Sequence, residues 1–251
     1  MERRQLTGNM VKGIIQLPEV VFLDVGETLF YPHPSFGELF HTVCRKHGHQ
    51  VDPREVSILA SRYMEEVEER QGRGFSFTDS PEKSGAFWRE FYHSILRDLG
   101  IQGEDHVLPE VLYRTFSDPS HYRPYPDGLE ALEALKQGGF RLGVITNFEP
   151  WVEELLDGWG ISSYLDIVVI SGLVGREKPH PDIFREALRR ADVPPGRALH
   201  VGDSPRSDFL GAREAGMQAV LLDRRGAHPG FPGPRISSLV ELPVLLRGGE
   251  R

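Results

Sequence analysis

Five short hydrophobic runs constrain the fold of this chain more than any other feature of its sequence. The runs read VVFLDV, RLGVIT, DIVVIS, ALHVGD and QAVLLD, and they lie near residues 20–25, 141–146, 166–171, 198–203 and 218–223. Each run is almost continuously hydrophobic, which is typical of parallel strands that are covered on both faces. Helical patterns lie beside the last four runs, at 126–139, 179–195 and 207–216. We therefore predict an α/β fold with an open parallel sheet and right-handed crossovers.

A long insertion separates the first run from the second. It exceeds a hundred residues, far more than an ordinary connection. Most of it has apolar residues at helical spacing, with faces at Val56, Leu59, Tyr63 and Val67 and from Phe87 to Leu99, and further helical patterns near 35–49 and 104–117. We predict a four-helix unit with a polar loop at 71–84. We therefore predict a helical cap domain at 33–121, inserted into a core domain built from 10–32 and 122–251. Residues 1–9 are predicted to be a loose extension.

The composition limits the classes of protein to which this chain can belong. Of its 251 residues 39% are hydrophobic and 26% are charged, which is enough for a buried core and argues against general disorder. The net charge of −8 argues against a partner that is nucleic acid. The single cysteine, Cys44, excludes an internal disulfide bond and suits a reducing compartment. Because we find no signal-peptide core and no run of roughly 18 apolar residues, we expect a soluble cytoplasmic protein without a membrane partner.

Polar residues stand at the ends of the first, second and fourth predicted strands and in the loop after the third. They are Asp24 after the first run, Thr146 and Asn147 after the second, Lys178 after the third, and Asp203 after the fourth, with Asp208 five residues on. In open α/β sheets, ligands bind beyond the carboxyl ends of the strands. Each residue taken alone would be an ordinary turn, cap or surface residue. Their shared position at strand ends predicts one active site.

Three carboxylates and a lysine form a set that suits chemistry on phosphate. A hard cation such as Mg²⁺ takes oxygen ligands from one or two carboxylates and from a phosphate. Asp24 would attack phosphorus as the nucleophile and form an aspartyl-phosphate. That attack brings two anions together, so Mg²⁺ and Lys178 must offset their repulsion. We expect Thr146, Asn147 and Lys178 to bind the phosphate.

The motifs DVGET, VITN, REKPHPDIF and GDSPRSDFLGAREAG resemble those of the haloacid dehalogenase-like (HAD) hydrolase superfamily. The insertion after the first strand is similar to the helical cap of its subfamily I. The resemblance implies a Rossmann-like core with Asp24 as nucleophile, Thr146 and Lys178 on the phosphate, and Asp203 on Mg²⁺. It makes Asp208 a further carboxylate of the metal site, either a ligand through water or an orienting group. The whole pattern is similar to the branch that contains haloacid dehalogenase-like hydrolase domain-containing protein 3.

Gly26 departs from the pattern of the phosphatases in that superfamily. They usually carry aspartate two residues after the nucleophile, with its backbone carbonyl on the metal and its side chain as general acid and base. Gly26 retains the carbonyl and lacks the acid. A proton could instead come from Glu27, His33 or a cap residue, although alternation along a strand predicts that Glu27 faces away from Asp24. Alternatively, the substrate has a good leaving group, as an acyl phosphate has.

The function predicted from these residues is a Mg²⁺-dependent phosphatase of a small phosphorylated metabolite, working as a monomer or homodimer. The absence of an acid at Gly26 leaves a second hypothesis, a weak or inactive protein that binds a phosphorylated ligand. The third is a 2-haloacid dehalogenase, whose reaction needs no metal. Those enzymes usually carry tyrosine or phenylalanine at the position of Gly26 and lack the Gly202–Asp203 pair, which favours the phosphatase.

Overall fold

The computed structural model of the chain describes residues 16–101 and 107–247. The predicted loose extension at 1–9 and the first predicted core residues, 10–15, lie outside the described residues. The same holds for the end of the predicted core, residues 248–251, and for the start of the predicted helix near 104–117. No helix in the described ranges combines the length and the apolar character needed to cross a membrane.

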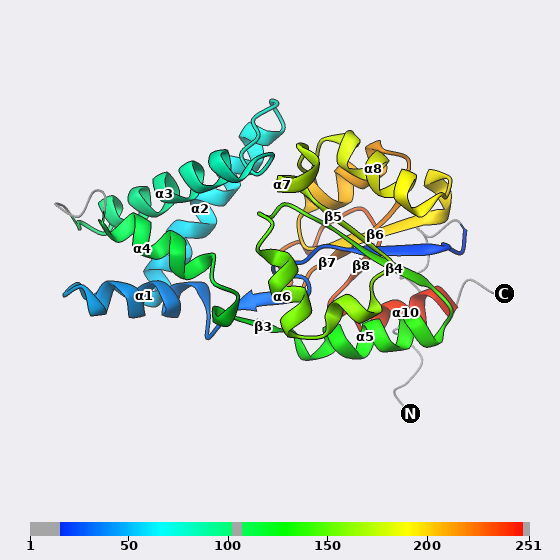
Figure 1. The fold of residues 1–251 in the computed structure, drawn as a ribbon, viewed down its shortest axis with the longest axis horizontal. Coiled ribbons are helices and arrows are strands. Elements are labelled where there is room, and N and C mark those ends of the chain that lie inside the picture. Colours follow the sequence, from blue (N-terminus) through cyan, green and yellow to red (C-terminus); the bar gives the residue numbers. More distant parts are fainter. Residues whose placement is uncertain (1–15, 102–106, 248–251) are drawn as a thin grey trace.

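The core is a parallel sheet of six strands in the order β5-β4-β1-β6-β7-β8 (Figure 1). The strands are β1 (Val20–Leu23), β4 (Arg141–Thr146), β5 (Ile167–Ile170), β6 (Ala198–Gly202), β7 (Gln218–Leu222) and β8 (Arg235–Ile236). The five predicted runs correspond to the first five of these. The sixth strand, β8, was not predicted, because two residues are too few to form a hydrophobic pattern.

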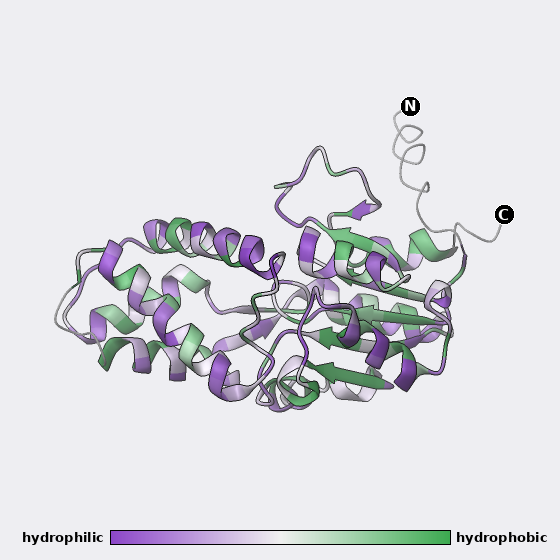
Figure 2. Cartoon of the chain, turned by 90° about the horizontal axis from the view of Figure 1, so that it is seen from above, coloured by the Kyte–Doolittle hydropathy of each residue, from purple (hydrophilic) through white to green (hydrophobic). Residues whose placement is uncertain are grey.

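Both faces of the sheet are covered by helices, as the continuous hydrophobic runs predict. One face packs against α5 (Pro126–Gln137), α6 (Val152–Gly158) and α10 (Glu241–Arg247), and the other against α8 (Pro181–Ala191) and α9 (Gly211–Glu214). The strand β1 is fully buried and contributes alternate residues to two hydrophobic clusters, Val21 and Leu23 to the first and Val20 and Phe22 to the second. Figure 2 shows these strands as hydrophobic bands. The predicted α/β class is confirmed.

The insertion contains four helices that pack on one another, beside the sheet in Figure 1. They are α1 (Phe36–Lys46), α2 (Pro53–Gln71), α3 (Pro81–Asp98) and α4 (Val107–Phe116). Ser35 caps α1 by accepting from the backbone N–H of Glu38 at 3.2 Å, and Ser80 caps α3 in the same way. The polar loop covers 72–80, which is shorter than predicted, because α2 continues to Gln71 and α3 begins at Pro81.

A short antiparallel ribbon connects the insertion to the core. It pairs β2 (Phe30–Pro32) with β3 (Tyr122–Pro124), and it was not predicted from the sequence. The predicted boundaries at 33 and 121 lie beside this ribbon and stay predictions. The remaining short elements are α7 (Ser171–Val174), the 3₁₀ turns Pro119–His121, Ile161–Tyr164 and Pro195–Arg197, and a π-helical turn, Pro205–Leu210.

Gly143, in the middle of β4, leads to a prediction about stability. A Cβ at this position would lie 2.7 Å from the ring of Phe22 and 2.8 Å from the carbonyl oxygen of Ile167. We expect Gly143→Ala to lower the free energy of unfolding by about 1–3 kcal/mol, because it overpacks a rigid core. Gly158→Ala is the control, since a Cβ there meets no heavy atom within 4 Å. Urea unfolding that gives both variants the same stability would contradict the packing of β4 against β1.

Candidate active site

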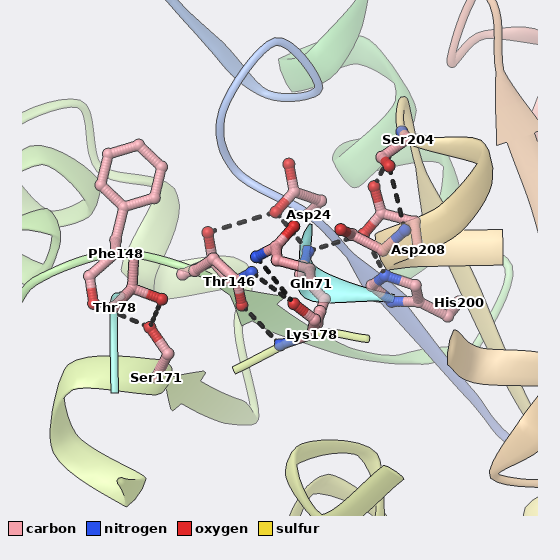
Figure 3. Close-up of polar contacts among 12 residues, drawn as sticks. Asp24, Gln71, Thr78, Thr146, Phe148, Ser171, Lys178, His200, Ser204 and Asp208 are labelled. Carbon is pink, nitrogen blue, oxygen red and sulfur yellow. Dashed lines mark hydrogen bonds and ion pairs between the residues drawn. The ribbon is translucent and has the colours of Figure 1, made fainter. Parts of the chain in front are cut away.

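The carboxyl ends of the parallel strands bring the predicted residues to one edge of the sheet. Figure 3 shows Asp24, Thr146, Lys178 and Asp208 close together there. Asp24 directly follows β1, and Thr146 is the last residue of β4. Asp203 directly follows β6, and the π-helical turn after it contains Asp208. Lys178 lies in the loop between α7 and α8. Residues that are up to 154 positions apart in the chain are therefore in direct contact.

Lys178 forms two short ion pairs at the centre of this cluster. Its Nζ lies 2.6 Å from Oδ1 of Asp24 and 2.6 Å from Oδ1 of Asp208. Burial opposes the charge of Lys178, but the carboxylates of Asp208 and Asp24 outweigh it and raise the pKa of the ammonium group. The hydroxyl of Thr146 donates to the same oxygen of Asp24 at 3.2 Å. All four side chains are buried, so water screens these contacts weakly.

His200 supports Asp208 from inside the sheet. It is fully buried on β6, and its Nε2 lies 2.8 Å from Oδ1 of Asp208. Because a carboxylate accepts, this contact places the imidazole proton on Nε2. The backbone N–H of Ser204 donates to the second oxygen of Asp208 at 3.0 Å. Although burial opposes its ionisation, the pKa of Asp208 is held below its ordinary value, above all by Lys178.

Asn147 lines the site but uses its side chain to hold the loop of Lys178. Its Nδ2 donates to the carbonyl oxygen of Lys178 at 2.8 Å, and its Oδ1 accepts from the backbone N–H of Lys178 at 2.7 Å. This pair of bonds resembles the pairing between two strands. It determines where the backbone of residue 178 lies, and therefore from which direction the ammonium group reaches Asp24.

Three carboxylates lie close enough to hold one metal ion. Oxygens of Asp24, Asp203 and Asp208 all lie within 4.8 Å of one another. Burial, then the charges of Asp208 and Asp24, raise the pKa of Asp203 well above its ordinary value. Burial also raises the pKa of Asp24, against the opposing charge of Lys178. A site made only of oxygen donors with excess negative charge fits a hard divalent cation.

Glu27 lies at the rim of the same site, although alternation along a strand predicts that it faces away from Asp24. The strand β1 ends at Leu23, and Glu27 has a left-handed φ of 52°, so the alternation of a strand does not extend to it. Glu27 and Asp24 line one cavity. The hydroxyl of Tyr125 and Nη2 of Arg225 donate to Oε2 of Glu27 at 3.0 and 2.9 Å.

The cavity above the strand ends has a volume of about 620 Å³ and is bounded by the core on one side and by α1, α2 and α3 on the other. Asp24, Thr146, Lys178 and Asp203 line it from the core. Met64 and Trp88 line it from the insertion. Across its rim, the hydroxyl of Ser204 donates to Oε1 of Glu68 on α2 at 2.8 Å. The insertion therefore forms the roof of the site.

Glu177 fastens the loop of the insertion to the core, and sequence reasoning missed it. Its side chain accepts from Nε2 of Gln71 at 2.8 Å, from the backbone N–H of Phe77 at 2.9 Å, and from the backbone N–H and hydroxyl of Thr78. Glu177 is buried. The sequence shows it only as one more charge in REKP, because its donors lie about a hundred residues earlier in the chain.

Comparison with known proteins identifies the family. The sequence model described as haloacid dehalogenase-like hydrolase matches residues 18–216, which include all of the predicted site residues. The chain belongs to this hydrolase family. Haloacid dehalogenase-like hydrolase domain-containing protein 3 of Homo sapiens is 32% identical over 205 residues, 79% of each chain. The predicted similarity to that branch is confirmed. Phosphoserine phosphatase of Thermus thermophilus is 35% identical over 150 residues, 59% of each chain.

Two solved structures of this family carry different reactions in their names. The 2-haloacid dehalogenase from Pseudomonas syringae pv. Tomato DC3000 is 27% identical with a TM-score of 0.60, over 92% of this chain and 99% of that one. The HAD phosphatase from Thermococcus onnurineus is 26% identical with a TM-score of 0.59, over 93% and 99%. Because similarity to the two is nearly equal, only the residues of the site distinguish dehalogenation from phosphate chemistry.

The carboxylate cluster predicts a response to Mg²⁺ that does not depend on activity. Without divalent cations, Asp203→Asn should raise the melting temperature, because it removes one of three charges that repel one another in a buried site. Mg²⁺ at a hundredfold excess over its Kd should stabilise the wild type by about 2.7 kcal/mol, which is several degrees. Asp203→Asn should lose most of that gain.

Glu130→Gln on the exposed side of α5 is the control for charge removal. It should keep the full response to Mg²⁺ in the same differential scanning fluorimetry. Equal Mg²⁺ shifts in Asp203→Asn and in the wild type would exclude a metal site at these carboxylates.

Proposed function

We propose that this chain is a Mg²⁺-dependent phosphatase that hydrolyses a small phosphorylated metabolite through an aspartyl-phosphate on Asp24. The observation that carries this proposal is the position of Lys178 Nζ, 2.6 Å from both Asp24 and Asp208 at the carboxyl edge of the sheet. It offers positive charge beside a carboxylate that must approach a phosphate. The similarity to a protein named phosphoserine phosphatase supports the same chemistry.

The hydrogen bonds of Asp24 leave one of its oxygens for the reaction. Oδ1 accepts from both Lys178 and Thr146, while Oδ2 accepts no hydrogen bond within the described residues. In the first step Oδ2 forms a bond to phosphorus, and the bond from phosphorus to the ester oxygen breaks. In the second step water attacks the aspartyl-phosphate, which releases phosphate and restores Asp24. Lys178 and Thr146 bind oxygens of the phosphoryl group in both steps.

Mg²⁺ would be held by Asp24, Asp203 and the backbone carbonyl of Gly26. When bound, it would supply positive charge to the phosphoryl oxygens as a Lewis acid. Asp208 accepts hydrogen bonds from Lys178, from His200 and from the backbone N–H of Ser204. The family resemblance allowed it to be either a metal ligand through water or an orienting group, and we assign it the orienting role. We assign Asn147 to positioning Lys178, in addition to the predicted contact with phosphate.

The substrate is small because the insertion covers the site. We propose that residues 33–121 act as a cap domain, held over the core by the contacts from Glu68 to Ser204 and from Gln71 to Glu177. The cavity of about 620 Å³ beneath it suits a metabolite. Dehalogenation needs no metal, whereas three carboxylates within 4.8 Å of one another suit a cation. The phosphatase therefore remains the preferred function.

Loss of the nucleophile tests the mechanism. We expect Asp24→Asn to lower the hydrolysis of acetyl phosphate and of p-nitrophenyl phosphate by about a thousandfold or more, because the covalent route is lost. Chelation of Mg²⁺ should have a comparable effect on the wild type. Release of inorganic phosphate is the measurement, and Glu130→Gln is the matched control. Activity that survives in Asp24→Asn, or halide release from 2-haloacids without metal, would overturn the assignment.

Glu27 is our candidate for the proton transfer that Gly26 cannot perform, since it lines the cavity with Asp24. Glu27→Gln should lower kcat on glycerol phosphate by about 10²–10⁴-fold, because an alkoxide leaving group needs a proton. Acetyl phosphate has a good leaving group, so its hydrolysis should change much less. Initial rates on the two substrates give the comparison. Equal losses on both would show that Glu27 acts in binding and not in proton transfer.

A further inference from the structure

A second cavity of about 280 Å³ opens beside the reaction cavity, between the loop after β4 and the helices α3 and α4. The two cavities share seven lining residues, among them Glu27, Trp88 and Phe148. Gly26 lines the second cavity, two residues after Asp24. A substrate whose phosphate lies at Asp24 could therefore extend its other end into this space.

The walls of the second cavity are aromatic and acidic. Eight of the sixteen residues that line it are aromatic, among them Phe36, Trp88, Tyr92, Phe116, Tyr122 and Trp151. Two more are carboxylates, Glu27 and Glu149, and none of the described residues in its wall is lysine, arginine or histidine. Glu27 is already paired with Arg225 at 2.9 Å, so Glu149 is the acidic group in this wall that points to a ligand of opposite charge.

Glu149 is the buried carboxylate in this wall that the proposed reaction does not use. Its side chain accepts from the hydroxyl of Tyr113 at 2.8 Å and forms no ion pair with any residue in the described ranges. Arg89 lies 4.1 Å from the ring centre of Tyr113, but it is bound to Glu110 at 2.5 Å and does not line the cavity. Burial raises the pKa of Tyr92 well above its ordinary value, and the charges of its neighbours, Glu149 among them, add to this.

Aromatic faces with a carboxylate are the chemistry that recognises ammonium groups in water-poor pockets. We propose that the second cavity binds the ammonium group of the substrate, so that the chain acts on the phosphate ester of an amino alcohol or a quaternary-ammonium alcohol. This inference rests on the proposed phosphatase function for the phosphoryl end of the substrate. The ammonium group lies among the rings, and Glu149 supplies the opposite charge.

This arrangement gives a structural reason for glycine instead of aspartate at position 26. A Cβ at residue 26 would lie 3.1 Å from the ring of Phe148, which lines both cavities. An aspartate there would push against this ring, which both cavities share as a wall. Glycine leaves the ring of Phe148 in its place.

A pair of isosteric esters tests the inference. Phosphocholine and 3,3-dimethylbutyl phosphate have the same shape, and only the first carries a positive charge. We expect kcat/KM for phosphocholine to be about tenfold higher or more, which is what a desolvated cation–π contact provides. A ratio near one, in a protein that hydrolyses acetyl phosphate, would overturn the ammonium site and leave the phosphatase standing.

Binding without catalysis separates the two proposals. Trp88 and Trp151 line the cavity, so choline should change the tryptophan fluorescence at concentrations about tenfold lower than 3,3-dimethylbutanol does. Glu149→Gln keeps an acceptor for Tyr113, and in this variant the two ligands should change the fluorescence at similar concentrations. The control Glu154→Gln, exposed on α6, should leave their difference unchanged. If the wild type prefers choline to 3,3-dimethylbutanol but hydrolyses no phosphate ester, the ammonium site is supported and the phosphatase is refuted. If the wild type shows no such preference, the ammonium site is refuted.

Discussion

The contact on which this structure depends is the ammonium group of Lys178 between the carboxylates of Asp24 and Asp208. Three charges are buried there, and burial is favourable only if their geometry is good. Removing one partner from such a buried pair typically costs about 3–5 kcal/mol. The neighbours of Lys178 serve this geometry: Asn147 holds its backbone, and Glu177 fastens the loop of the insertion. One short loop thus joins the charged site to its roof.

The same cluster has more negative than positive charge, and this imbalance explains its chemistry. Lys178 compensates one carboxylate, while Asp24 and Asp203 keep raised pKa values in the buried site. A divalent cation would restore the balance and lower both values. A phosphate brings further negative charge, so in the proposed reaction it would enter beside Lys178 and the bound cation. Repulsion among the carboxylates is therefore consistent with the proposed metal site as well as with the position of the lysine.

The sequence predicts this site because parallel strands bring their carboxyl ends to one edge. Hydrophobic runs located β1, β4 and β6, and Asp24, Thr146 and Asp203 follow from the positions of those ends. His200 was missed because a single histidine within a buried run gives no signal until its partner is known. Glu177 was missed because its donors lie at the end of α2 and in the loop after it, about a hundred residues earlier in the chain. The orientation of Glu27 depends on its positive φ, which strand alternation does not include.

The most direct test of the account is to trap the covalent intermediate on Asp24. The wild-type protein is mixed with Mg²⁺ and radiolabelled acetyl phosphate, quenched in acid within one turnover, and digested for peptide mass spectrometry. We predict a phosphoryl group on the peptide that contains Asp24, and its loss in Asp24→Asn. Steady hydrolysis without a labelled peptide, or with the label on another residue, would contradict it.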